Sequence, residues 1–113
     1  MQVQHGYLYL ADLNPRYGSE AGKIRPVLVI QNDYLNEENH PSTWILPCTT
    51  RLTGSNILRV FLPKNIAGND KDCEVMIDQS RAIDRSRFKS ELGPLPDLVL
   101  KEIKDKLRLL GNL

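Results

Sequence analysis

The stretch Gly18–Lys23 offers the first chemical interpretation of this sequence, that of a phosphate-binding loop. A P-loop places four residues between its two glycines, and a Ser or Thr after its lysine holds magnesium. Here three residues separate Gly18 from Gly22, and Ile24 follows Lys23. The spacing and the missing hydroxyl both argue against nucleotide hydrolysis of this kind.

Nucleophilic and metal-assisted catalysis also lack the side chains that they require. Neither His5, near the N-terminus, nor His40, in a polar stretch, is placed to activate a serine, and we expect both to be exposed. Cys48 and Cys73 are too few for a disulfide framework and show no paired metal-ligand spacing. We expect Cys48 to pack inside an apolar strand, and the chain to need no metal and no cofactor.

Phosphate contacts are the remaining chemistry that the charged residues support. The net charge is only +1, but basic side chains gather in two stretches, Arg16–Arg25 and Arg81–Lys89. Local basic patches can bind phosphate through few ion contacts, although a charged face is equally typical of a solvated surface. Acidic side chains collect elsewhere, at Glu37, Glu38, Asp70, Asp72 and Glu74.

The hydrophobic pattern predicts a series of short strands. Alternation predicts a first strand at Tyr7–Leu13, and the β-branched run Val27–Ile30 predicts a strand that is buried on both faces. The polar stretches Arg16–Ile24 and Asn32–Ser42 are expected to be loops, and Pro63–Asp72 a connection with room for a helical turn. Further strands are expected at Thr43–Thr50, Leu58–Leu62, Val75–Ile77 and Phe88–Leu92.

The C-terminal segment changes to a helical period. Val99, Ile103, Leu107 and Leu110 follow at helical spacing, after Asp97 as the expected N-cap and before Gly111 as the expected C′ residue. Strands with polar loops and one closing helix predict a mainly β, α+β fold: a small curled barrel capped by the helix.

Length and composition predict one folded domain over residues 1–113. The 41% hydrophobic and 26% charged content is ordinary for a folded protein. No apolar run approaches the ~20 residues that span a bilayer, and residues 1–5 do not resemble a signal peptide. We therefore expect a cytoplasmic protein with reduced thiols and no membrane contact.

Four segments, in order along the chain, resemble the MazF/PemK family of bacterial toxins. Gly6–Pro15 (GYLYLADLNP) is similar to the first strand of that family and its D-L-N-P turn. Gly18-Ser19-Glu20 followed by Arg25–Asp33 (RPVLVIQND) resembles its G-S-E loop and following strand. Leu46–Thr50 (LPCTT) resembles its P-x-T-T segment, and Asp78–Arg87 (DQSRAIDRSR) its D-Q-x-R-x-I-D-x-x-R stretch.

This resemblance, which extends from Gly6 to Leu110, implies both a fold and a function. It implies an SH3-like barrel of the MazF/PemK/CcdB type that forms a homodimer. It also implies the toxin of a type II toxin–antitoxin system, an mRNA interferase that cleaves single-stranded RNA within a short sequence and so inhibits translation. The expected partners are RNA and a cognate antitoxin with an acidic, partly disordered tail. The variable loops 32–42 and 51–56 are expected to set the target sequence, which stays open.

The resemblance further implies that Arg25 and Thr49 are the catalytic pair. RNA carries its own nucleophile, the 2′-hydroxyl, so an enzyme needs only to align it and to stabilise charge on the phosphorane-like transition state. An arginine fork suits two phosphate oxygens, and a strand threonine offers a rigidly mounted hydroxyl donor. Without the resemblance, Arg25 would be interpreted as an ordinary surface arginine, and Thr49 as a strand residue whose hydroxyl bonds a neighbour.

Four further residues are expected to contact RNA: Glu20, Thr50, Gln79 and Arg81. The Gln79 amide can bond a base edge, and Arg81 can pair with phosphate or stack on a base, although both can equally serve a structural polar network. Arginine is a poor general base, so the acceptor of the 2′-hydroxyl proton stays open. Glu20 is a candidate for it, unless it is merely exposed or paired with Arg25.

Two other classes of protein remain as alternatives. A non-catalytic barrel toxin could bind and poison an enzyme such as DNA gyrase, as CcdB-type toxins do, because a fold does not fix a function. A non-catalytic RNA- or chromatin-binding barrel should show an aromatic platform, yet aromatic residues make up only 6% of this chain. The Arg25 and Thr49 pair, which a pure binder does not need, favours the nuclease.

Overall fold

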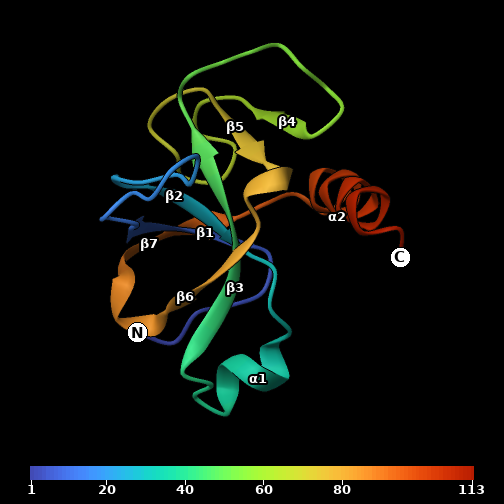
Figure 1. Cartoon of the computed structure of the whole chain (residues 1–113). Helices are drawn as coiled ribbons and strands as arrows, with labels where there is room; N and C mark the ends of the chain where they lie inside the picture. Colours follow the sequence, from blue (N-terminus) through green and yellow to red (C-terminus); the bar gives the residue numbers. More distant parts are fainter.

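The computed structural model describes all 113 residues and consists of a curled sheet with two α-helices outside it (Figure 1). The helices are α1 (Asp33–Glu37) and α2 (Asp97–Gly111), and two 3₁₀ turns follow β5 and β6, η1 (Ile77–Gln79) and η2 (Arg85–Arg87). The strands are β1 (Tyr7–Asp12), β2 (Ile24–Val29), β3 (Ser42–Thr49), β4 (Arg59–Leu62), β5 (Cys73–Met76), β6 (Arg81–Asp84) and β7 (Phe88–Pro94).

The sheet is organised around β3, which runs through the centre of the molecule (Figure 1). β2 pairs with one edge of β3, while β5 and β6 share the other edge, β5 near its C-terminal end and β6 along its N-terminal half. The full order is β4-β5-β3-β2-β1-β7 with antiparallel neighbours, so β4 and β7 remain as open edges. This is the mainly β architecture with a C-terminal helix that the sequence predicts, in an incompletely closed form.

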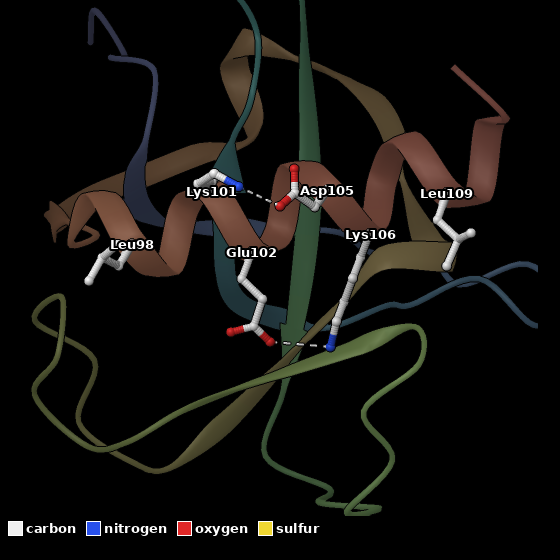
Figure 2. Close-up of a pocket in the computed structure, with 6 residues that line it drawn as sticks. All are labelled: Leu98, Lys101, Glu102, Asp105, Lys106 and Leu109. Atoms are coloured by element: carbon white, nitrogen blue, oxygen red, sulfur yellow. Dashed lines mark hydrogen bonds and ion pairs between the residues drawn. The ribbon is translucent and has the colours of Figure 1, made fainter.

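The two faces of β2 enter two separate hydrophobic clusters. Leu28 belongs to the cluster that includes Ile103 of α2, whereas Val27 and Val29 belong to the cluster around Tyr9. The prediction that this strand is buried on both faces is therefore confirmed for Val27–Val29, which are 0% exposed. α2 covers only the first cluster. It carries the exposed ion pair Lys101–Asp105 and, on the side toward β4, the ion pair Glu102–Lys106 (Figure 2).

The helix α1 corrects the prediction that residues 32–42 form a loop without regular structure. Asn32 caps the helix by accepting a 2.8 Å hydrogen bond from the Tyr34 amide. Behind it, the buried amide of Asn36 exchanges hydrogen bonds with Gln31. Side-chain caps and a buried amide pair hold a single turn that hydrophobic periodicity does not reveal.

Several predicted boundaries were also wrong. β6 was not predicted, although Asp84 at its end caps the following turn by accepting from the Ser86 amide. Residues 63–72 contain turns and no helix. Pro96 rather than Asp97 occupies the N-cap of α2, and Asn112 rather than Gly111 adopts the left-handed conformation at its end. No helix is long and apolar enough to cross a membrane.

Candidate active site

The registers of the sheet bring Arg25 and Thr49 together at one end of β2 and β3. β2 pairs with β3 from Val29↔Ile45 to Val27↔Pro47, and Arg25 and Thr49 each lie two residues beyond the last of these pairs, at neighbouring strand ends. The structure thus juxtaposes two residues that are 24 positions apart in the sequence.

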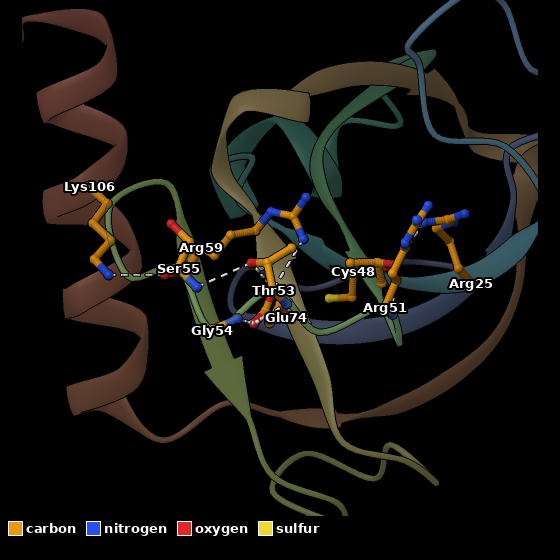
Figure 3. Close-up of polar contacts among 10 residues, drawn as sticks. Arg25, Cys48, Arg51, Thr53, Gly54, Ser55, Arg59, Glu74 and Lys106 are labelled. Carbon is orange, nitrogen blue, oxygen red and sulfur yellow. Dashed lines mark hydrogen bonds and ion pairs between the residues drawn. The ribbon is translucent and has the colours of Figure 1, made fainter.

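Backbone oxygens fix the orientation of the half-buried Arg25 side chain. Its Nε donates to the Gly22 carbonyl at 2.7 Å. Its Nη1 donates to the Cys48 carbonyl at 3.2 Å (Figure 3). A guanidinium has five N–H donors, so these two bonds leave the others available for an anion. The side chain is therefore held in place without its charge being neutralised, since it forms no salt bridge.

The surroundings of Arg25 destabilise its charged form relative to that of an exposed arginine. Burial lowers its pKa from the ordinary arginine value, and repulsion from Arg16 acts in the same direction, against an opposing effect of Cys48. A lowered pKa makes the guanidinium a better proton donor than an exposed arginine. The setting agrees with an acid-like role and with charge stabilisation.

The Thr49 hydroxyl is also oriented with its proton free. Its Oγ1 accepts a 3.1 Å hydrogen bond from the Arg51 amide, two residues along the chain. It donates to no protein oxygen, so a phosphate oxygen could take that proton. Thr50, the next residue, is exposed just beyond the strand.

Arg81 contacts the β1–β2 loop (residues 13–23), which Arg25 also contacts. It lies opposite Ile45 on β3, on the face that Ile45 shares with Thr49, and its Nη1 donates to the Ala21 carbonyl at 3.4 Å. Arg25 and Arg81 thus hold adjacent carbonyls of one loop, those of Gly22 and Ala21. Two of the predicted site residues converge on a common segment.

The remaining predicted residues are less closely engaged. Glu20 lies on the same loop, is exposed and forms no ion pair with Arg25. Gln79 is half-buried in η1 and makes no side-chain hydrogen bond, so the structure does not join it to Arg25 or Thr49. No group of three or more His, Cys, Asp or Glu side chains is arranged to hold a metal ion.

Sequence reasoning missed the residues that orient Arg25. Gly22 was noted only as a loop residue, yet a Cβ at this position would lie 2.7 Å from the Arg16 Cβ, so the close approach requires glycine. Cys48 contributes its carbonyl while its thiol is buried; a hydrogen bond with Cys73 and burial raise the thiol pKa. The expectation that Cys48 packs within the strand is confirmed by its 0% exposure.

Comparison with known proteins gives concordant matches in sequence and fold. Residues 4–111 match the family described as "PemK-like, MazF-like toxin of type II toxin-antitoxin system". The Endoribonuclease MazF of Staphylococcus saprophyticus is 37% identical over 106 residues, which cover 93% of this chain and 88% of that protein.

Solved structures agree over the whole chain. The crystal structure of MazF from Deinococcus radiodurans superposes with a TM-score of 0.85 and 29% identity, covering 100% of this chain and 99% of that one. A MazE–MazF structure from the same organism gives a TM-score of 0.79 at 28% identity, with 100% and 99% coverage. The family match over nearly the full length, with the identity to the Staphylococcus protein, shows that this chain belongs to the PemK-like, MazF-like toxin family of type II toxin–antitoxin systems.

Proposed function

We propose that this chain is a cytoplasmic endoribonuclease toxin that cleaves single-stranded RNA at a short sequence without a metal ion. Its family and the activity named for its Staphylococcus relative support this function. The observation that carries the proposal is that Arg25 reaches the end of β3 beside Thr49, with each side chain oriented by backbone groups and each left with unused donors.

The reaction is a transesterification in which the substrate supplies the nucleophile. The 2′-oxygen bonds to phosphorus, the bond to the 5′-oxygen breaks, and the products are a 2′,3′-cyclic phosphate and a 5′-hydroxyl. The free donors of Arg25 and the Thr49 hydroxyl stabilise the charge that develops on the phosphoryl oxygens. Arg25, with its lowered pKa, is placed to give a proton to the leaving 5′-oxygen.

The proton of the 2′-hydroxyl requires an acceptor. Glu20 is our candidate, since it is exposed, unpaired with Arg25 and located on the loop that Arg25 and Arg81 hold. Thr50, Gln79 and Arg81 complete the proposed RNA site around the catalytic pair. Arg81 supplies positive charge to the phosphate backbone, and the Gln79 amide is free to bond a base edge.

Incubating the purified chain with a long RNA in excess EDTA tests this function. We expect discrete fragments whose 5′ ends accept phosphate from a polynucleotide kinase without prior dephosphorylation, because cleavage leaves 5′-hydroxyls. An oligonucleotide with a single 2′-deoxy sugar at the scissile position should bind but stay intact. Cleavage of that oligonucleotide would contradict the mechanism, and intact RNA under all conditions would favour the non-catalytic alternative.

We also propose two protein partners. The MazE–MazF structures from Deinococcus radiodurans suggest that this chain has a cognate antitoxin, whose acidic, partly disordered tail would suit the basic residues Arg25 and Arg81. A second copy of the chain would cover exposed apolar side chains such as Ile57 (67% exposed) and Phe61 (51%). Light scattering on the purified chain, alone and with the product of the neighbouring gene, tests both assemblies.

A further inference from the structure

Glu74 is a buried carboxylate that the proposed chemistry leaves unused. The residue is 2% exposed and lies on β5, opposite Thr49 of β3 and Phe61 of β4. Its side chain therefore projects from the same face as that of Thr49, on the side away from Arg25. A carboxylate in such a position is destabilising unless several donors compensate its lost hydration.

The compensating donors all come from the β3–β4 loop (residues 50–58) and the start of β4. The Thr53 amide lies 3.1 Å from both carboxylate oxygens, the Thr53 hydroxyl donates at 3.0 Å, and the Gly54 amide donates at 3.0 Å. Arg59 adds an ion pair at 3.1 Å (Figure 3). The loop backbone thus folds around the carboxylate, with Gly54 at φ +73°, a conformation that favours glycine.

The electrostatics favour the ionised form of Glu74. Burial by itself raises the pKa of Glu74, but the hydrogen bonds from Thr53 and Gly54, together with Arg59, outweigh it and lower the pKa below the ordinary glutamate value. A second tether acts on the far end of the loop, where Lys106 of α2 donates to the Asn56 and Arg59 carbonyls. Charged side chains therefore hold the loop at its middle and at its far end.

This loop begins at the proposed catalytic residue. The Arg51 amide donates to the Thr49 hydroxyl, so the path of the loop determines how that hydroxyl is oriented. Arg51 and Leu52 are exposed on the same short segment, available to a bound ligand. A shift of the loop would displace both the hydroxyl and these exposed side chains.

We propose that Glu74 is a positioning residue of the RNA site, which holds the β3–β4 loop so that Thr49 is oriented and Arg51 and Leu52 meet the nucleotides beside the scissile bond. The proposal rests on the RNA cleavage proposed above. Glu74 touches no substrate; it acts through the loop. Because Thr49 itself stays in β3, where it pairs with β5, loosening the loop weakens RNA binding and sequence choice more than it slows the chemical step.

The test compares Glu74→Gln with Glu91→Gln, a matched change at an exposed glutamate on the edge strand β7. An amide in place of the carboxylate has one acceptor oxygen fewer for the donors of the loop. Loss of charge-assisted hydrogen bonds should speed amide hydrogen exchange of residues 50–58 at least about tenfold.

RNA recognition should change as well. KM for an RNA oligonucleotide should rise about tenfold, equivalent to roughly 1.4 kcal/mol of binding, with a smaller change in kcat. Cuts in a long RNA should spread over more sequences. Glu91→Gln should leave all three unchanged.

Glu74→Asp, which keeps the charge, should restore part of the loop protection and of the cleavage pattern, and it serves as the second variant if Glu74→Gln does not fold. Unchanged exchange in residues 50–58 of a folded Glu74→Gln protein would overturn the clamp. Faster exchange with unchanged KM and cut sites would overturn its role in RNA recognition. A wild-type chain that cuts no RNA would remove the proposed function and this role with it, while the exchange measurement still decides whether Glu74 holds the loop.

Discussion

The two loops that flank Arg25 and Thr49 are held by opposite kinds of anchor. The β1–β2 loop offers its carbonyls to cations: Arg25 holds Gly22 and Arg81 holds Ala21. The β3–β4 loop offers its amides to an anion, the carboxylate of Glu74. The difference matters because RNA is a polyanion, and it can compete for the first kind of anchor but not for the second.

The comparison separates a responsive loop from a fixed one. We expect a phosphate bound to the unused donors of Arg25 and Arg81 to shift the β1–β2 loop that their other donors hold, so that the position of Glu20 changes with the substrate. We expect the β3–β4 loop to keep its anchor, and Thr49 its orientation, when RNA binds. We therefore expect the β1–β2 loop to adjust to RNA and the β3–β4 loop to keep its position.

The largest expected effect is on catalysis by variants at Arg25 and Thr49, which lie between the two loops. Arg25→Ala and Thr49→Ala should each reduce kcat/KM by ~10²-fold or more, because each removes a contact made to the developing charge. Arg25→Lys should also lose most activity, since an ammonium cannot make both backbone bonds and a phosphate contact with the same geometry. Cleavage assays beside circular dichroism check this, with Arg108→Ala on α2 as the charge-matched control. A fully active, folded Arg25→Ala protein would contradict the assignment.

The stability that Glu74 contributes through the β3–β4 loop should depend on pH. The folded pKa of Glu74 is lowered, so its stabilisation is present above the ordinary glutamate pKa of 4.5 and is lost as the pH falls through the folded value. Glu74→Gln should therefore lower the free energy of unfolding by about 2 kcal/mol at pH 7, and by progressively less in acid. Urea denaturation of both proteins at pH 7 and at pH 3 measures the difference. A constant gap between the two proteins would show that the charge of Glu74 does not stabilise the fold.

A smaller effect, on RNA binding, is expected from removing Arg81, which contacts the β1–β2 loop. Arg81→Ala should raise KM about tenfold and reduce the dependence of RNA binding on salt by about one ion contact. Arg85→Ala is the control, because Arg85 belongs to the same basic stretch but donates to Asn39 on a different loop. Binding measured from 50 to 300 mM salt distinguishes them. Equal salt slopes for both variants would make Arg81 a structural residue only.

The sequence predicted the central part of this site but not its supports. Arg25, Thr49 and Arg81 were identified through motifs, and the β2 and β3 patterns that align the first two are strong because both strands are buried. Glu74, by contrast, was grouped with exposed acidic residues such as Asp72. A glutamate between apolar neighbours gives no sign of burial until the loop that neutralises it is known.

The two elements that the sequence did not predict, α1 and β6, also depend on contacts that only the folded chain brings together. α1 depends on the cap at Asn32 and on the Gln31–Asn36 amide pair, and β6 depends on its pairing with β3. Each is stabilised by polar contacts between residues whose proximity the fold itself creates. Hydrophobic periodicity detects strands and helices that bury a face, and it overlooks those that side-chain hydrogen bonds secure.

The smallest expected effect concerns Cys48, and it tests whether the site depends on backbone or side-chain groups at the end of β3. Arg25 contacts the Cys48 carbonyl, which every residue carries, whereas the thiol points into the opposite cluster beside Cys73. Cys48→Ala should therefore leave kcat/KM within about threefold of wild type and reduce stability by roughly 1 kcal/mol through lost packing. Since burial and the bond to Cys73 raise the thiol pKa, a maleimide reagent should label Cys48 only when the chain unfolds. Cleavage kinetics, thermal denaturation and labelling with and without urea measure these expectations. Loss of activity in a folded Cys48→Ala protein would mean that the thiol itself, and not the strand that carries it, orients Arg25.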